Sequence, residues 1–315
     1  MSTLSRELDR YLTIRRSLGY RLRANERILR KLVSFAEQHG AEYISTDLFL
    51  RWQKASGSAS RHTWAQNLAM VRLFAQWLHG IDPKHEVPPQ GLIPKQNRRP
   101  RPYIYSDDEI RRIVEETAEL PSFNGIRGLT YPTLFGLIAV TGMRISEALS
   151  LDARDVDLET GVITIQRGKF GKSRLLPLST DTTARLTAYT KERDRHLGCQ
   201  PEPFFVSDWG GRIADNTARC TFAAVCQNIG LRRAQRVGRS GCGPRIHDLR
   251  HTFAVRTIMN WYRTGKNPAQ EMIKLTSYLG HADPADTYWY IEAVPELLEL
   301  ASRRATDSLT REVAS

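Results

Sequence analysis

Residues 162–178 have the sequence VITIQRGKFGKSRLLPL, and this stretch decides the expected fold class. Two runs rich in β-branched and apolar residues, 162–165 and 174–178, flank the basic, glycine-containing segment 168–172. This pattern predicts an antiparallel β-hairpin. Elsewhere the apolar residues recur mostly at helical spacing. The sequence therefore predicts a mainly α-helical protein with a small antiparallel β-sheet.

Upstream of the hairpin, the segment 80–102 divides the chain. It cannot continue a helix, because prolines interrupt it repeatedly, and its basic residues suit a linker that runs along a polyanion. Its prolines are Pro83, Pro88, Pro89, Pro94, Pro100 and Pro102. We therefore predict an all-helical N-terminal domain over 1–95 and a mixed α+β domain over 96–315.

A helix start is expected directly after this linker. Ser106 is followed three residues later by Glu109, which is the capping-box pattern, and it predicts a helix from Asp107 to about Glu119. Carboxylates in the first turn interact favourably with the positive end of the helix dipole. That interaction explains the acidic residues better than a metal-dependent nuclease site does.

The charge balance favours a nucleic-acid partner. The chain has 46 Lys and Arg residues against 34 Asp and Glu residues, a net charge of +12, and such an excess attracts polyanions. One basic stretch lies on the N-terminal helices and contains Arg15, Arg16, Arg21, Arg23, Arg27, Arg30 and Lys31. We interpret it as a phosphate-contacting face, with a solvated helix face as the alternative.

Composition also excludes several classes of protein. No apolar run approaches the roughly 20 residues that a membrane-spanning helix needs, and the first residues, Met1 to Glu7, show no signal-peptide pattern. The four cysteines contain no CxxC pair, so neither a zinc site nor a disulfide framework is indicated. We expect a cytoplasmic protein with no bound metal or cofactor.

Four short motifs in the second domain carry the candidate chemistry. Cleaving a phosphodiester without a metal requires a nucleophile, neutralisation of charge on the phosphorus centre and a proton for the leaving oxygen. Each motif alone arises by chance in basic proteins, whereas the four in this order form a strong signal. They are Thr141-Gly142-Met143-Arg144, Gly168-Lys169, His247-Asp248-Leu249-Arg250-His251 and Leu279-Gly280-His281, followed by Tyr290.

The two arginines of these motifs are candidates for binding one phosphate. Arg144 follows a Thr-Gly turn at an expected helix start, and Arg250 lies three residues after His247, on the same helix face. Planar, permanently charged guanidiniums suit the non-bridging oxygens of a phosphate. The alternative for Arg144 is a structural salt bridge to Glu147, and both roles are compatible.

The segment around Tyr290 contains a second tyrosine, Tyr288. On a helix, residues two apart differ by about 200° around the axis, so only one hydroxyl can face the arginines. A phenol with a pKa of about 10 is a poor nucleophile at neutral pH, so the site must remove its proton or stabilise the phenolate.

Together the motifs resemble the tyrosine recombinase, or phage integrase, family. The resemblance covers the chain from about Tyr103 onward, and the helical first domain resembles the core-binding domain of that family. It implies that Tyr290 is the nucleophile and that His247 is the general base. The implied phosphate-binding residues are Arg144, Arg250 and His281, with Glu147 supporting Arg144. Lys169 is nominated as the general acid, with Lys172 as the alternative.

The resemblance also implies the activity and the partners. Such an enzyme is a site-specific DNA recombinase or integrase that exchanges strands through a 3′-phosphotyrosyl intermediate and a Holliday junction, without a metal or nucleotide cofactor. Its partners are double-stranded DNA recombination sites, further copies of the chain in a tetramer, and accessory recombination proteins. The C-terminal residues resemble integrases of transposable elements. A type IB topoisomerase-like enzyme and a catalytically inactive DNA-binding protein of the same fold are the alternatives.

Overall fold

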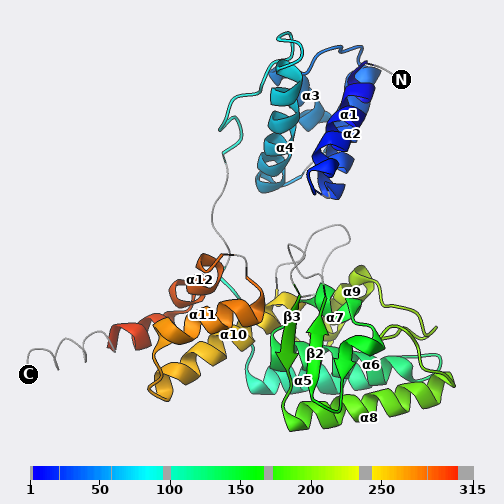
Figure 1. The fold of residues 1–315 in the computed structure, drawn as a ribbon, viewed down its shortest axis with the longest axis vertical. Coiled ribbons are helices and arrows are strands. Elements are labelled where there is room, and N and C mark those ends of the chain that lie inside the picture. Colours follow the sequence, from blue (N-terminus) through cyan, green and yellow to red (C-terminus); the bar gives the residue numbers. More distant parts are fainter. Residues whose placement is uncertain are drawn as a thin grey trace, which may run out of the picture. The chain divides into compact units, whose positions relative to one another are not determined.

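The computed structural model describes residues 3–20, 22–57, 59–94, 101–166, 173–233, 243–281 and 283–303. The chain divides into two compact units, Met1–Arg99 and Pro100–Ser315 (Figure 1). Each unit contains its own hydrophobic core. The roles predicted for the domains 1–95 and 96–315 stay predictions at this point.

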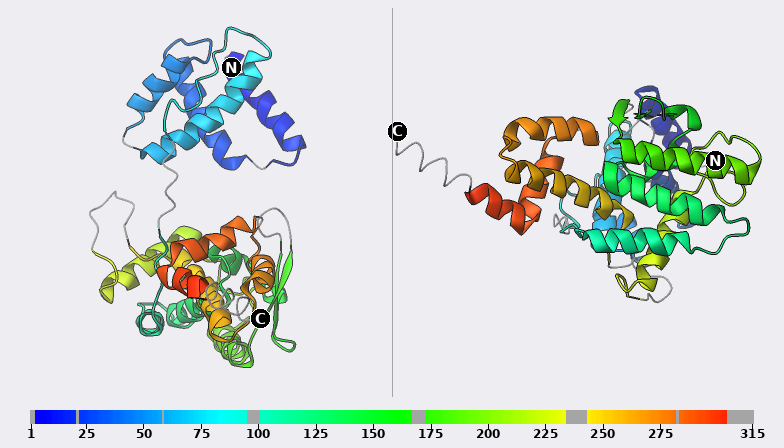
Figure 2. Two further views of the ribbon diagram at one scale, coloured as in Figure 1. Left: turned by 90° about the vertical axis from the view of Figure 1, so that its left-hand side faces the viewer. Right: turned by 90° about the horizontal axis from the view of Figure 1, so that it is seen from below.

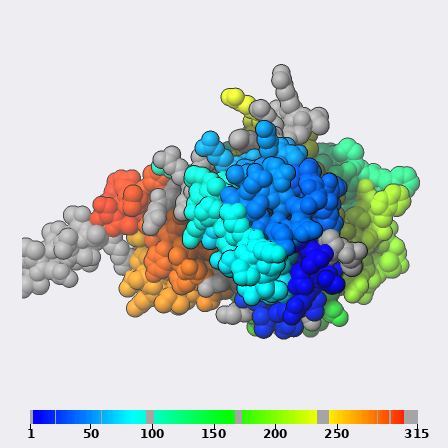
Figure 3. All heavy atoms as spheres, turned by 90° about the horizontal axis from the view of Figure 1, so that it is seen from above, coloured from blue at the N-terminus to red at the C-terminus, as the bar shows by residue number. Residues whose placement is uncertain are grey.

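The first unit is helical in its described residues. Figure 3 shows its atoms in blue to cyan. Its core includes the edge-to-face pair Trp52 and Trp64, whose ring centroids are 5.0 Å apart. The side chains of Ser45 and Ser60 accept hydrogen bonds from backbone N–H groups and begin the third and fourth helices. The helices are α1 (Thr3–Ser17), α2 (Arg23–Gln38), α3 (Thr46–Ala55) and α4 (Arg61–His79).

Ion pairs occupy part of the Arg-rich stretch of this unit. Arg16 pairs with Glu26, and Arg30 lies 2.8 Å from Asp9 and 3.0 Å from the same Glu26. These two arginines join α1 to α2, a role that neither interpretation of the basic stretch predicted. All of these side chains keep solvent contact, and exposed pairs of this kind stabilise a fold by less than about 1 kcal/mol.

The second unit contains the predicted hairpin. Strands β1 (Val156–Asp157), β2 (Val162–Ile165) and β3 (Arg174–Pro177) form an antiparallel sheet in the order β1-β2-β3. Val162 pairs with Pro177 and Ile165 pairs with Arg174. The predicted fold class, mainly α with a small antiparallel sheet, is confirmed. The segment 167–172, with the candidates Lys169 and Lys172, lies outside the described residues.

Helices pack around this sheet. The Ser106 and Glu109 capping box begins α5, which confirms the predicted helix start. Seen from below in Figure 2, α5, α6 and α8 lie side by side, and their apolar faces share one core with the sheet. No helix among the described residues is long and apolar enough to cross a bilayer. These helices are α5 (Asp107–Ala118), α6 (Ile126–Thr141), α7 (Ile145–Ser150), α8 (Thr180–Leu197) and α9 (Asp215–Asn228).

The last helices form a separate apolar cluster in the second unit. They are α10 (Ile246–Arg263), α11 (Pro268–Leu279) and α12 (Ala285–Ala293), which Figure 1 shows together at one side of the sheet. Trp261, Met272 and Leu297 are among its buried residues. A further helical segment begins at Pro295 and continues to Arg303, the last described residue.

Glycine is required at the end of α6. Gly142 has φ +65°, a left-handed conformation that L side chains rarely adopt. A Cβ atom at this position would lie 2.4 Å from Cδ1 of Phe253, which α10 places against the helix end. Close packing of α6 against α10 therefore depends on the missing side chain of Gly142.

We predict that Gly142→Ala destabilises the second unit by about 2–4 kcal/mol, because it combines backbone strain with displacement of a packed ring. Gly136→Ala, in the same helix, is the matched control. A Cβ at Gly136 meets nothing within 4 Å, so this change should stabilise the helix by about 0.5–1 kcal/mol. Urea unfolding measures both values, and equal stability of the two variants would contradict the packing argument.

Candidate active site

Three arginine side chains from three elements bind the C-terminal end of α11. The carbonyl oxygens of residues 278, 279 and 280 accept hydrogen bonds, in that order, from Arg174 at 2.8 Å, Arg250 at 2.7 Å and Arg144 at 2.8 Å. The last carbonyls of a helix lack intrahelical donors and carry partial negative charge. The helix end therefore gathers three guanidiniums that the chain supplies from β3, α10 and the start of α7.

Glu147 is the carboxylate that holds two of these arginines. Its oxygens accept hydrogen bonds from Arg174 at 3.0 and 2.9 Å, from Arg144 Nη1 at 2.7 Å and from the Arg144 backbone N–H at 2.8 Å. Burial alone would raise the pKa of Glu147, but the hydrogen bonds from Arg174 and Arg144 outweigh burial and lower the pKa to about 2. The predicted support of Arg144 by Glu147 is thus present, and Arg174 shares it.

Arg250 is the most deeply buried of the three, with a relative exposure of 1%. Its second guanidinium nitrogen donates to the carbonyl oxygen of Gly142 at 2.8 Å. Burial and the neighbouring charge of Arg144 lower the pKa of Arg250 to about 10, so the group stays charged at neutral pH. Three cations surround one carboxylate here, and this excess of positive charge favours the binding of an anion.

The close approach of these groups to the α11 end depends on Gly280. This residue has φ +65°, and a Cβ atom would lie 2.9 Å from Nη1 of Arg174 and 3.5 Å from Nη1 of Arg144. A side chain at this position would push the guanidiniums away from the carbonyls that they bind. Two left-handed glycines, Gly142 and Gly280, thus supply carbonyl oxygens to Arg250 and Arg144.

His281 follows directly on this helix end. Its Nδ1 atom lies 2.7 Å from Oγ1 of Thr287, and that hydroxyl lies 3.0 Å from Oγ1 of Thr276. Thr287 is fully buried, so the contact fixes the orientation of the imidazole ring. The ring stacks towards Tyr290, with the two ring centroids 6.4 Å apart.

The two tyrosines of α12 differ in their surroundings. Tyr290 is 2% exposed and lies inside the α10–α12 cluster, whereas Tyr288 is 44% exposed. The Tyr290 hydroxyl lies 2.9 Å from Nδ1 of His251. The ring centroid of Tyr290 also lies 6.4 Å from that of His281, the residue that follows the arginine-bound carbonyl of Gly280. The helix thus turns one hydroxyl inward and the other outward.

His247 lies one helical turn before His251. The two rings meet edge to face with centroids 4.5 Å apart. Desolvation, Arg250 and other nearby arginines lower the pKa of His247 to about 4. Because the residue retains solvent contact at the surface, we assign this shift chiefly to the guanidiniums. The imidazole is then neutral at pH 7.

Four of the six predicted site residues thus meet at one place: Arg144, Arg250, His281 and Tyr290. The ring of His247 contacts His251, and it is His251 whose Nδ1 atom lies at the Tyr290 hydroxyl. Lys169 lies outside the described residues. The sequence interpretation missed two residues. Arg174 follows the predicted hairpin turn, and His251 is the last residue of the His247 motif. No feature of the sequence distinguishes either residue from an ordinary structural arginine or histidine.

A family model described as "Phage integrase family" matches residues 104–296, which is more than half of the chain. The chain belongs to the phage integrase family. A relative from Sinorhizobium fredii named "Putative integrase/recombinase y4rB" is 40% identical over 309 residues, covering 96% of this chain and 97% of the relative. The Bacillus subtilis protein named "Tyrosine recombinase XerC" is 27% identical over 263 residues, covering 82% and 79%. The family predicted from the motifs is confirmed.

Solved structures of integrases and recombinases share the fold. The Tn1549 transposon integrase in complex with transposon right end DNA is 15% identical and covers 92% of this chain and 94% of that chain, with a TM-score of 0.64. The XerH site-specific recombinase bound to palindromic difH substrate is 20% identical and covers 87% and 77%, with a TM-score of 0.61. At identities this low, the similarity to these two structures shows that this chain shares their fold.

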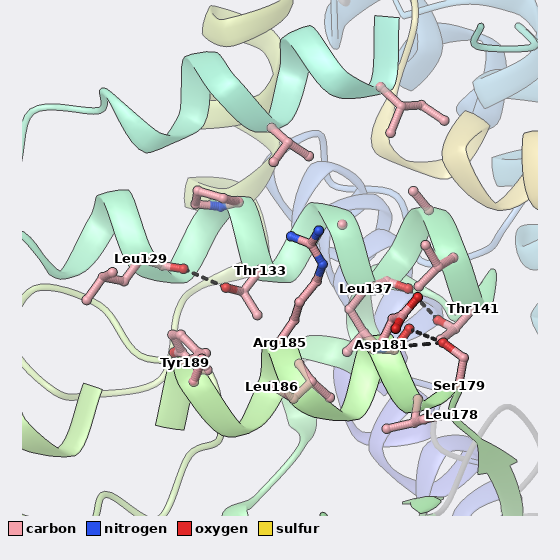
Figure 4. Close-up of a pocket in the computed structure, with 18 of the residues that line it drawn as sticks. Leu129, Thr133, Leu137, Thr141, Leu178, Ser179, Asp181, Arg185, Leu186 and Tyr189 are labelled. Atoms are coloured by element: carbon pink, nitrogen blue, oxygen red, sulfur yellow. Dashed lines mark hydrogen bonds between the residues drawn. The ribbon is translucent and has the colours of Figure 1, made fainter. Parts of the chain in front are cut away.

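A pocket of about 740 Å³ lies elsewhere in the second unit, between α5, α6 and α8 (Figure 4). Its wall is largely apolar and includes Leu129, Leu137 and Tyr189, while Arg185 extends from α8 in the direction of α6. The arginines, histidines and Tyr290 of the candidate site do not line it. Among the described residues, no group of three or more His, Cys, Asp or Glu side chains could hold a metal ion.

We predict that Glu147→Gln destabilises the second unit in a pH-dependent way. The pKa falls from 4.5 to about 2 on folding, which corresponds to about 3 kcal/mol of stability. Because the folded-state pKa is the lower one, this stabilisation is fully present above about pH 4.5 and is lost as the pH falls through 2.

The measurement is the difference in unfolding free energy between wild type and Glu147→Gln as a function of pH. The difference should be largest near neutral pH and should shrink below about pH 4.5. Glu192→Gln is the control, because this carboxylate is on the surface, where it pairs with Arg195. A constant difference down to pH 2 would contradict the proposed charge network.

Proposed function

We propose that this protein is a site-specific DNA recombinase in which Tyr290 attacks a DNA phosphodiester and forms a 3′-phosphotyrosyl bond. The observation that carries the proposal is the cluster of three guanidiniums at the end of α11, with the Tyr290 ring packed against His281, which follows that helix end. Such a cluster suits a phosphate whose negative charge grows in the transition state. Membership of the phage integrase family supports it.

In this proposal each residue has a distinct role. Arg144 and Arg250 bind the non-bridging oxygens, since guanidiniums form paired hydrogen bonds with phosphate. In binding phosphate they would redirect some donors that now bind the carbonyls of α11 and Gly142. His281 donates a hydrogen bond to the same phosphate, and its ring is already oriented by Thr287.

Proton transfer completes the reaction. The nucleophile must lose the proton of its hydroxyl, and the leaving 5′-oxygen must gain one. The family resemblance nominates His247 as the base and Lys169 as the acid, with Lys172 as the alternative acid. In the sequence both lysines lie between β2 and Arg174. Arg174 itself donates a hydrogen bond to the end of α11 and pairs with Glu147.

Strand exchange needs more than one copy of the chain. We propose that the protein acts in the cytoplasm as a tetramer on two double-stranded DNA recombination sites, passes through a Holliday junction and works with accessory recombination proteins. An origin in a mobile element fits the likeness to the Tn1549 transposon integrase. Storing the backbone bond on Tyr290 would let a new 5′-hydroxyl reseal the strand without a nucleotide cofactor.

We predict that Tyr290→Phe abolishes adduct formation while retaining DNA binding. A nicked suicide substrate, whose short 5′-fragment diffuses away, should trap the wild type as a denaturation-resistant adduct on a DNA 3′-phosphate. Tyr290→Phe loses one oxygen and keeps the ring that packs in the α10–α12 cluster, so the fold should persist.

The matched control is Tyr288→Phe on the same helix, which changes an exposed ring and should still form the adduct. An adduct that survives in Tyr290→Phe and vanishes in Tyr288→Phe would show that Tyr288, and not Tyr290, is the nucleophile. A wild type that forms no adduct on the ends of its own element would contradict the recombinase proposal itself.

A second expected outcome concerns DNA affinity. With a net charge of +12, binding should weaken as salt rises, by about 0.9 in log K per phosphate contacted for each tenfold change in salt. Fluorescence anisotropy with duplex DNA between low and physiological salt measures this slope. An affinity that does not change with salt would remove DNA as the partner.

A further inference from the structure

His251 is a buried histidine whose side chain meets the proposed nucleophile. Its relative exposure is 6%, and its Nδ1 atom lies 2.9 Å from Oη of Tyr290. This distance is a hydrogen bond between the imidazole and the atom that would attack phosphorus. The family resemblance nominated His247 for proton transfer, and it assigned no role to His251.

We propose that His251 takes the proton of Tyr290 and is the general base of the reaction. This inference rests on the proposed function. A general base must lie within hydrogen-bond reach of the proton that it removes, and Nδ1 of His251 meets that condition. The neutral tautomer with its proton on Nε2 leaves the Nδ1 lone pair directed at the hydroxyl.

The proton balance of the step is complete. As Oη of Tyr290 forms its bond to phosphorus, the bond between phosphorus and the 5′-oxygen breaks. The phenolic proton passes to Nδ1 of His251, and the 5′-oxygen takes a proton from the general acid, for which Lys169 is proposed. In the rejoining step a 5′-oxygen forms its bond to phosphorus and gives its proton to the amine of the same lysine, while the imidazolium returns its proton to Oη as the phosphotyrosyl bond breaks.

The groups around His251 suit this role. From α10, the ring of His247 lies 4.5 Å away between centroids, and Arg250 is the preceding residue. From α12, the rings of Tyr290 and Trp289 lie at 5.4 and 5.6 Å. The ring centroid of His281, after α11, lies 6.4 Å from that of Tyr290.

These surroundings keep the imidazole ready to accept a proton. The positive charge of Arg250 disfavours a second cation beside it before DNA is bound. A bound phosphodiester adds negative charge, which favours the imidazolium as it forms. The neighbouring His247 ring lies towards the surface, whereas His251 is buried against the hydroxyl of Tyr290.

The test compares His251→Asn with His247→Asn in single-turnover adduct formation on the nicked suicide substrate. Asparagine places an oxygen acceptor near the position of Nδ1 and keeps a hydrogen bond to Oη, but it cannot take the proton. We expect His251→Asn to bind DNA as the wild type does and to react about 10²–10⁴ times more slowly. A rate within about threefold of wild type would overturn the proposal and leave His251 as a positioning residue.

A second measurement does not require that His251→Asn folds. It is the pH dependence of the rate of adduct formation in the wild type and in His247→Asn. The wild-type rate should rise with pH across the range of about 5 to 8 in which histidines titrate. This rise should persist in His247→Asn, whose changed residue is at the surface. A rise that disappears in His247→Asn would assign the titrating group to His247 and overturn the assignment to His251, even if His251→Asn does not fold.

The two proposals fail in different ways. If the wild type forms no covalent adduct at all, the recombinase proposal fails, and the role of His251 fails with it. If the wild type forms an adduct through Tyr290 but His251→Asn reacts at the wild-type rate, the recombinase proposal stands and only the assignment of the base is lost.

Discussion

The rest of the candidate site depends on the hydrogen bonds between three arginines and the C-terminal end of α11. Its last carbonyl oxygens bind Arg174, Arg250 and Arg144, which come from positions far apart in the sequence. Separate cations would repel one another at this distance, and the helix end and Glu147 offset that repulsion. The arrangement links β3, α7 and α10 to the helix that precedes His281, and it does so with charged groups that remain suited to an anion.

Much of this architecture could be predicted from local sequence patterns. The capping box at Ser106, the antiparallel hairpin and the helical first unit follow from short-range rules that act within a few residues. The pairing of Arg144 with Glu147 was also predictable, because residues three apart lie on one face of a helix. In each case the physical cause lies within one element or between neighbours in the chain.

Long-range contacts could not be predicted in the same way. Arg174 stands in a strand where a basic residue is usually solvated, and its partner Glu147 is distant in the sequence. His251 lies on α10 one turn after the histidine that the motif singles out, and only the packing of α12 brings Tyr290 to it. The sequence showed which residue types could do the chemistry, whereas tertiary packing selects among neighbouring histidines.

The anchoring of Arg174 also has an evolutionary consequence. Ile165 and Arg174 are the pair of the β2–β3 ladder that lies nearest to the turn, and Arg174 is fixed to α11 through the carbonyl of Tyr278. Insertions or deletions between these two positions would therefore leave both flanking strands held in place. Chains of this fold can in this way differ in the length of the segment that joins β2 to β3 while the core beneath the sheet stays the same.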